Sequence, residues 1–157
     1  MAHDESTLKR ELLQARLVSA IFSDSVSRRF RVHVALKGGL AMRLMQGSHR
    51  ATKDIDLQSD GTFPVEAARK WMTNLIRQTA KDLGLANVRV TEPKQTDTTQ
   101  RWKAVYATAS GVESHLTIEM SRRGLPDPEY VCERPVGGPE RIPVLARTYS
   151  PQDSPHS

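Results

Sequence analysis

The chain has 157 residues, which fit one domain better than two because most single domains have roughly 100–150 residues. It contains no run of about 20 apolar residues and no features of a secretory signal, so a membrane span is excluded and we expect a cytoplasmic protein. The net charge of +5 is compatible with an anionic partner, and the single cysteine excludes an internal disulfide.

The first predicted elements are a long helix and a strand. Helical spacing of apolar residues predicts an amphipathic helix over residues 5–29, and the helix dipole favours the arginines near its C-terminal end. The residues expected on its buried face are Leu8, Leu12, Ala15, Phe22 and Val26. Alternation over residues 32–36 predicts a strand that Gly38 and Gly39 interrupt. Residues 40–46 then predict a short helix.

Residues 53–58 predict the next strand, because Ile55 and Leu57 alternate with Asp54 and Asp56. Beyond it, Pro64 and an apolar stripe at helical spacing predict a helix that ends near Gly84. The elements predicted after this helix are a strand at residues 88–90, an exposed loop over residues 92–100, and an antiparallel hairpin formed by residues 101–110 and 114–121.

The chain from Arg122 onward is rich in proline and glycine, and only residues 142–146 have the pattern of a strand. The order of helices and strands indicates an α/β (α+β) fold with a mixed sheet and helices packed on it. We expect one domain over residues 1–148 and a flexible C-terminal tail over residues 149–157.

Two aspartates on one predicted strand suggest a metal site. Asp54 and Asp56 project from the same face, roughly 6.5–7 Å apart along the backbone. Like charges at this spacing favour a bound cation, and hard oxygen ligands suit Mg²⁺ or Mn²⁺ better than zinc. The alternative is a solvated polar face on an edge strand.

A predicted turn upstream of these acids has the character of a phosphate site. Gly38 and Gly39 lie between a strand and a helix, where backbone N–H groups are open to an anion and no Cβ blocks a phosphate. Lys37, Arg43 and Arg50 are near in sequence and can add positive charge. The alternatives are an ordinary glycine turn and, for Lys37 and Arg43, solvated cations near a helix end.

Glu119 is a third candidate carboxylate, on the polar face of the last hairpin strand. If that strand lies beside the Asp54 strand, the three acids can hold two divalent ions, which together stabilise an in-line displacement at phosphorus. The alternative is that Glu119 pairs with Arg101 or Arg122 across the hairpin.

A known family signature is similar to the segment from Leu36 to Leu57, LKGGLAMRLMQGSHRATKDIDL. It is that of the nucleotidyltransferase superfamily, most closely the AbiEii-type toxins of bacterial abortive-infection and toxin–antitoxin systems. Their pattern is Lys-Gly-Gly, a short helix, then Arg-x-Ser/Thr-x-Asp-Ile/Leu-Asp. The residues that match it are Lys37, Gly38, Gly39, Arg50, Thr52, Asp54, Ile55 and Asp56, with Glu119 on the third acidic strand.

The resemblance implies a nucleotidyltransferase-like domain over about residues 17–147 and an activity of the EC 2.7.7 type, moving an NMP from an NTP to an acceptor hydroxyl. By this resemblance, the catalytic and metal-binding residues are Asp54, Asp56 and Glu119, with two Mg²⁺ or Mn²⁺ ions. The nucleotide- and phosphate-binding residues are Lys37, Gly38, Gly39, Arg50 and Thr52. The implied acceptor is RNA, with the 3′ end of tRNA the best guess, and the implied partner is a cognate antitoxin.

The sequence departs from the family pattern at two points, and two other functions stay open. Leu40 stands where the family usually has Thr or Ser, and the family typically continues into a helical C-terminal domain, so we expect the catalytic half alone. One alternative is an incomplete module that binds nucleotide or RNA without turnover. The other is an antibiotic-type enzyme that modifies a small hydroxylated compound.

Overall fold

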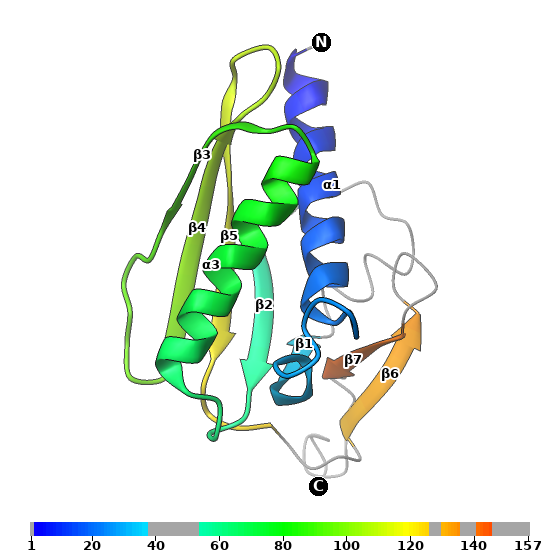
Figure 1. Cartoon of the computed structure of the whole chain (residues 1–157), viewed down its shortest axis with the longest axis vertical. Coiled ribbons are helices and arrows are strands. Elements are labelled where there is room, and N and C mark those ends of the chain that lie inside the picture. Colours follow the sequence, from blue (N-terminus) through cyan, green and yellow to red (C-terminus); the bar gives the residue numbers. More distant parts are fainter. Residues whose placement is uncertain (1, 38–53, 126–129, 136–140, 146–157) are drawn as a thin grey trace, which may run out of the picture.

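The computed structural model describes residues 2–37, 54–125, 130–135 and 141–145, and it shows a mixed sheet covered on one face by two helices (Figure 1). The helical elements are α1 (Ala2–Ile21), the short 3₁₀ helix η1 (Arg31–His33) and α3 (Val65–Asp82). The strands are β1 (Val34–Lys37), β2 (Asp54–Ser59), β3 (Ala86–Thr91), β4 (Thr99–Ala107), β5 (Glu113–Ser121), β6 (Val131–Pro135) and β7 (Arg141–Leu145).

The sheet has seven strands in the order β3-β4-β5-β2-β1-β7-β6. Strand β2 is parallel to β5, and β1 is parallel to β7, whereas the other neighbouring strands are antiparallel. The mixed α+β fold predicted from the order of elements is therefore confirmed. Strand β2, which carries the paired aspartates, lies in the middle of the sheet.

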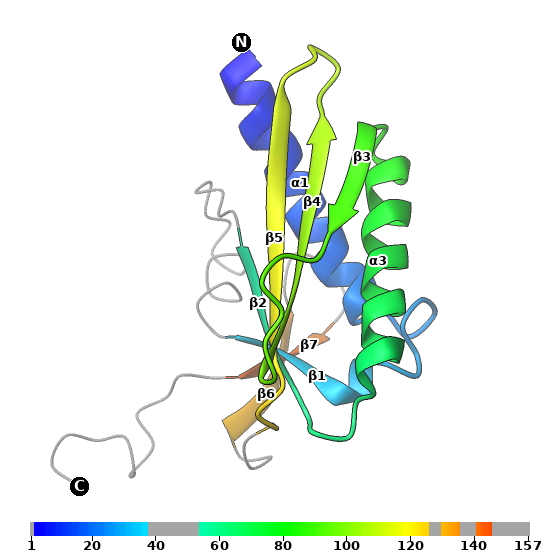
Figure 2. The same ribbon diagram turned by 90° about the vertical axis from the view of Figure 1, so that its left-hand side faces the viewer.

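The core lies between the sheet and the two helices. In β2, β4 and β5 every second side chain is buried, as expected for strands with one face packed and one open. Helix α3 buries one stripe, including Trp71, Met72 and Ile76, and its predicted position is confirmed. No described helix covers the opposite face of the sheet, and Figure 2 shows α3 standing along one side of the strands.

The prediction for the first helix was wrong about both its end and its buried face. Helix α1 ends at Ile21, and the following residues form turns in which the Ser27 hydroxyl donates to the Ala20 carbonyl at 2.7 Å. Serine side chains compete in this way with helical backbone bonds. The buried stripe contains Leu13, Leu17, Val18 and Ile21. Of the residues predicted to be buried, Phe22 is buried, whereas Leu8, Leu12, Ala15 and Val26 are exposed.

The wrong face was chosen because α1 carries two apolar stripes. Leu8 and Leu12 have the same helical spacing as Leu13 and Leu17, so periodicity alone does not distinguish them. Only the position of the sheet and of α3 decides which stripe is covered. The arginines at 28, 29 and 31 therefore do not lie at the end of α1, and Arg31 instead pairs with Asp24 at 2.7 Å.

The C-terminal part has one more strand than predicted. Strand β7 confirms the predicted strand near residues 142–146, but β6 was missed because its edge position and prolines obscure the alternation. Strand β4 begins at Thr99, so the last two residues of the predicted loop pair with β5.

The predicted helix at 40–46 and the predicted tail lie outside the described residues. No described helix is long and apolar enough to cross a membrane.

The turn between β2 and α3 is fixed by an interaction between Asp60 and His33. The Asp60 carboxylate lies 2.8 Å from His33 Nδ1 and accepts two hydrogen bonds from Thr62. Partial burial acts to raise the pKa of Asp60, but the hydrogen bonds and the charge of His33 outweigh it, and the pKa lies below its usual value. The ring of His33 also stacks on Phe63.

Replacing Asp60 with asparagine is expected to lower the free energy of unfolding at neutral pH by about 1 kcal/mol, because the pair is partly exposed. Folding lowers this pKa, so the stabilisation is complete above the ordinary value of 3.8 and is lost as pH falls through the folded value. Urea denaturation should show a difference in the free energy of unfolding between wild type and Asp60→Asn at neutral pH, and this difference should disappear in acid. A difference that does not change with pH would contradict the stabilising role of the Asp60 carboxylate.

Candidate active site

The two candidate aspartates lie on the open face of β2. Asp54 and Asp56 are exposed, while Ile55 and Leu57 between and after them are fully buried in the core. This confirms the predicted alternation. The alternative of an edge strand is wrong, because β2 is paired with β5 on one side and β1 on the other.

Glu119 lies directly beside Asp56. The parallel register of β2 and β5 places Asp56 opposite Glu119 and Asp54 opposite Thr117. Neighbouring strands are about 4.8 Å apart, so side chains on one face at the same register are within reach of each other. The strand adjacency on which the three-acid prediction depended is therefore present.

Glu119 also has an arginine on its other side. The antiparallel register of β4 and β5 places Arg101 opposite Glu119, and Arg101 Nε lies 3.4 Å from Glu119 Oε1. Arg122, the other partner considered, donates instead to the Gln100 side chain and the Phe63 carbonyl. Glu119 therefore pairs with Arg101, as the alternative interpretation predicted, and it also lies beside Asp56, as the metal-site prediction requires.

Lys37 extends a row of charges across the open face. The register of the antiparallel pair of β1 and β2 is observed as far as Leu36 opposite Leu57, and its continuation by one residue brings Lys37 to the level of Asp56. The row across β1, β2, β5 and β4 consists of Lys37, Asp56, Glu119 and Arg101. Two carboxylates thus lie between two cations, an arrangement suited to oxygen ligands of a metal next to phosphate-binding groups.

The sequence is similar to a known family over most of its length. The family model described as "Nucleotidyl transferase AbiEii toxin, Type IV TA system" matches residues 21–153. The chain belongs to the AbiEii family. The resemblance of the Lys-Gly-Gly and Asp-Ile-Asp segments to this family is thereby confirmed. No match was found among curated proteins.

Solved structures show that the fold is shared. The AbiEii domain is similar to the crystal structure of JHP933 from Helicobacter pylori, with a TM-score of 0.61 and 20% identity over 91% of this chain and 53% of that one. It is also similar to MenT4, a nucleotidyltransferase toxin from Mycobacterium tuberculosis, with a TM-score of 0.53 and 16% identity over 90% of this chain and 49% of that one. The AbiEii chain thus spans about half the length of these structures.

Several predicted phosphate-binding residues of the AbiEii motif lie outside the described residues. These are Gly38, Gly39, Arg50 and Thr52, and Lys37 is the motif residue that the structure describes; Arg43, considered as a nearby cation, also lies outside the described residues. A residue whose role was not predicted from the sequence contacts strand β2 from helix α1. The buried side chain of Gln14 on α1 donates to the Asp54 carbonyl at 3.2 Å. The sequence feature that could have indicated this contact is an isolated glutamine among the buried leucines of α1.

The acidic residues of the AbiEii domain have the right chemistry for a hard divalent cation. Asp54, Asp56 and Glu119 offer carboxylate oxygens from neighbouring strands, which suits Mg²⁺ or Mn²⁺. Among the side chains that the structure describes, no three His, Cys, Asp or Glu residues converge closely enough to hold a metal ion as they stand. The type of ligand therefore fits such an ion, whereas a metal site shared by the three residues stays a prediction.

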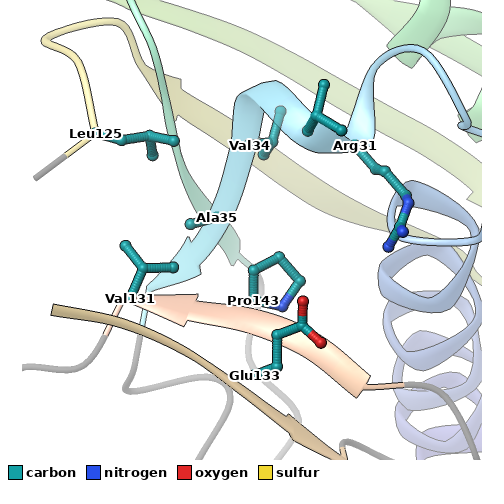
Figure 3. Close-up of a pocket in the computed structure, with 8 residues that line it drawn as sticks. Arg31, Val34, Ala35, Leu125, Val131, Glu133 and Pro143 are labelled. Carbon is teal, nitrogen blue, oxygen red and sulfur yellow. The ribbon is translucent and has the colours of Figure 1, made fainter. Parts of the chain in front are cut away.

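Two pockets in the described part of the chain lie away from these acids. One has a volume of about 260 Å³ beside β1, β6 and β7 (Figure 3). Its lining includes Ala35, Val131 and Pro143, with Arg31 and Glu133 among its charged residues. The other, of about 530 Å³, lies between α3 and residues 92–100. Neither is lined by Asp54, Asp56 or Glu119, which lie on the open face of β2 and β5.

Proposed function

We propose that this protein is a metal-dependent nucleotidyltransferase toxin that transfers an NMP from an NTP to an acceptor hydroxyl with release of pyrophosphate. The observation that carries the proposal is the position of Asp56 beside Glu119 on the open face of the sheet, with Asp54 two residues away on the same face. Membership of the AbiEii family supports the same activity.

Asp54, Asp56 and Glu119 are the residues that would hold Mg²⁺ or Mn²⁺, and we propose two ions. A divalent ion at such a site neutralises charge on the phosphate oxygens and stabilises the attacking and leaving oxygens. The carboxylates would orient the ligands, and Glu119 would accept a proton from the acceptor hydroxyl. Lys37, beside Asp56, would neutralise phosphate charge.

The other proposed phosphate-binding groups come from the family motif. Gly38 and Gly39 would present backbone N–H groups to the NTP phosphates. Arg50 would add a planar guanidinium that can donate two hydrogen bonds to one phosphate, and Thr52 would stabilise the turn before β2. Little covalent chemistry is required of the protein in phosphoryl transfer. Positioning and electrostatic stabilisation therefore supply most of the rate enhancement.

RNA is the proposed acceptor, and the 3′ end of tRNA is the proposed site of modification. The excess of basic residues, with 23 Lys and Arg against 18 Asp and Glu, is compatible with a phosphate-rich acceptor. The type IV toxin–antitoxin description of the family supports a cognate antitoxin as partner.

Transfer of label from each NTP, labelled at the α-phosphate, tests the proposed activity. Wild type is incubated with Mg²⁺ or Mn²⁺ and with total RNA, total protein or the small-molecule fraction of a cell extract. We expect label in RNA, no label in the presence of EDTA, and labelling that falls steeply as salt rises, because RNA binding releases counterions. Asp54→Ala is expected to abolish the signal.

Other outcomes of this assay identify other functions. Label in the small-molecule fraction, insensitive to salt, would replace the RNA acceptor with an antibiotic-type substrate. Labelling that persists in EDTA or in Asp54→Ala would contradict the proposed metal site. No transfer by a folded wild-type protein that still binds NTP would identify a binding module and contradict the proposed activity of this chain.

A further inference from the structure

Arg101, the partner of Glu119, is itself fixed by a loop. Residues 92–98 connect β3 to β4 and fold back onto the start of β4. The Arg101 guanidinium donates through Nη1 to the Lys94 carbonyl. The Gln95 side chain accepts from the Arg101 backbone N–H at 3.2 Å and donates to the Arg101 carbonyl at 2.8 Å. Both the main chain and the side chain of Arg101 are therefore held from the loop.

The loop has its own anchor on helix α3. Arg69 Nε lies 3.0 and 2.9 Å from the two oxygens of Glu92, so its N–H donates a bifurcated hydrogen bond to the carboxylate. Hydrogen bonding and charge from Glu92 raise the pKa of Arg69. A backbone hydrogen bond from Thr96 to the Thr99 carbonyl closes the other end of the loop at 3.1 Å. The position of Arg101 is thus set by contacts that do not involve Glu119.

A guanidinium fixed in this way imposes its position on the carboxylate that it meets. Arg101 Nε faces Glu119 Oε1 at 3.4 Å, and the two side chains are 27% and 38% exposed. The structure gives Oε2 of Glu119 no hydrogen bond or ion pair among the described residues. Oε1 of Glu119 therefore faces Arg101 on one side, and the strand register places Asp56 on the other side of Glu119.

We propose that Arg101 is a positioning residue that orients Glu119 for binding a divalent cation beside Asp56, with residues 92–98 holding Arg101 in place. This inference rests on the proposed function of the same site. Hydrogen-bond partners of metal-binding carboxylates typically contribute about 10–100-fold to metal affinity. The fixed geometry of Arg101 places it in this role.

A purely electrostatic role for Arg101 predicts that its removal has the opposite effect on metal affinity. A guanidinium near the site repels a divalent cation, so removing it would tighten metal binding if orientation of Glu119 were unimportant. Lys103 provides the matched control. It lies on the same face of β4, two residues from Arg101 and opposite Thr117, and no described ion pair joins it to Glu119.

The test is Mn²⁺ binding to the whole chain, measured by calorimetry and by the electron paramagnetic resonance signal of free Mn²⁺. The variants are Arg101→Gln, Glu119→Gln, the double variant, Gln95→Ala, Lys103→Gln and Asp56→Ala. We expect Arg101→Gln to weaken binding about 10-fold and Gln95→Ala to weaken it less. Lys103→Gln should leave binding unchanged or slightly tighter. In the Glu119→Gln background, Arg101→Gln should have almost no further effect.

Two readouts separate this inference from the proposed function and from simple loss of structure. Circular dichroism and thermal melting identify any unfolded variant, and Gln95→Ala carries the test if Arg101→Gln does not fold. Unchanged or tighter Mn²⁺ binding in folded Arg101→Gln, together with loss of binding in Asp56→Ala, would overturn the role of Arg101 alone. Binding that is unaffected by Asp56→Ala, or absent from wild type, would overturn both proposals.

Discussion

Asp56→Asn is expected to lower the rate of NMP transfer by at least about 1,000-fold, which corresponds to about 4 kcal/mol of transition-state stabilisation. Asp56 lies between Lys37 and Glu119 in the charged row and is exposed on the open face. Asparagine keeps the size of the side chain but removes the charge and one of the oxygen ligands. The loss should appear in single-turnover transfer at saturating NTP.

The stability of Asp56→Asn should be unchanged or slightly higher. The carboxylate makes no described ion pair, and its removal relieves repulsion from Asp54 on the same face. Glu113→Gln is the matched control, because Glu113 is an exposed acid on β5 that pairs with Arg89 at 2.9 Å, far along the strand from Glu119. It should retain wild-type transfer. Full activity in Asp56→Asn, or equal losses in both variants, would contradict the assignment.

Trp102→Ala is expected to have the largest effect on folding, lowering the free energy of unfolding by about 3–5 kcal/mol. The Trp102 side chain is 0% exposed on β4, beneath the two helices. Its removal leaves a cavity in a packed core, and the loss is a large share of the roughly 5–15 kcal/mol that stabilises a typical domain. Urea denaturation followed by circular dichroism measures it.

Trp102→Phe separates the cost of the cavity from the chemistry of the indole. The indole N–H is buried, and no described group accepts a hydrogen bond from it. Phenylalanine fills much of the same space and removes this unsatisfied donor, whose burial costs about 1–3 kcal/mol. We therefore expect Trp102→Phe to lose much less stability than Trp102→Ala. Equal losses in the two variants would show that the N–H group has a partner in solution.

The local pattern of the sequence determined those features that depend on neighbouring residues alone. Alternation in β2 places Asp54 and Asp56 on one face and Ile55 and Leu57 on the other, because the side-chain period of a strand is two. The same reasoning predicted the β4–β5 hairpin and the open position of Glu119. Helix α3 was predicted because it has a single apolar stripe.

Other features were decided by contacts between segments that are distant in the sequence. Helix α1 has two possible apolar faces, and only its packing against the sheet selects the one with Leu13 and Leu17. The parallel pairing of β2 with β5 brings Glu119 beside Asp56, and no residue near either strand specifies that order or register. Strand pairing of this kind depends on the packing of the whole sheet.

The surroundings of Glu119 show, within one site, both what the local sequence determines and what tertiary contacts decide. The sequence indicated that Glu119 is a candidate metal ligand and that Arg101 is a candidate partner, as two alternatives. The tertiary structure gives Glu119 both neighbours, because β5 lies between β2 and β4. Residue types and periodicity thus determined the chemistry available on each strand. Strand order, register and the fold of loop 92–98 decided which groups meet, because those are long-range interactions.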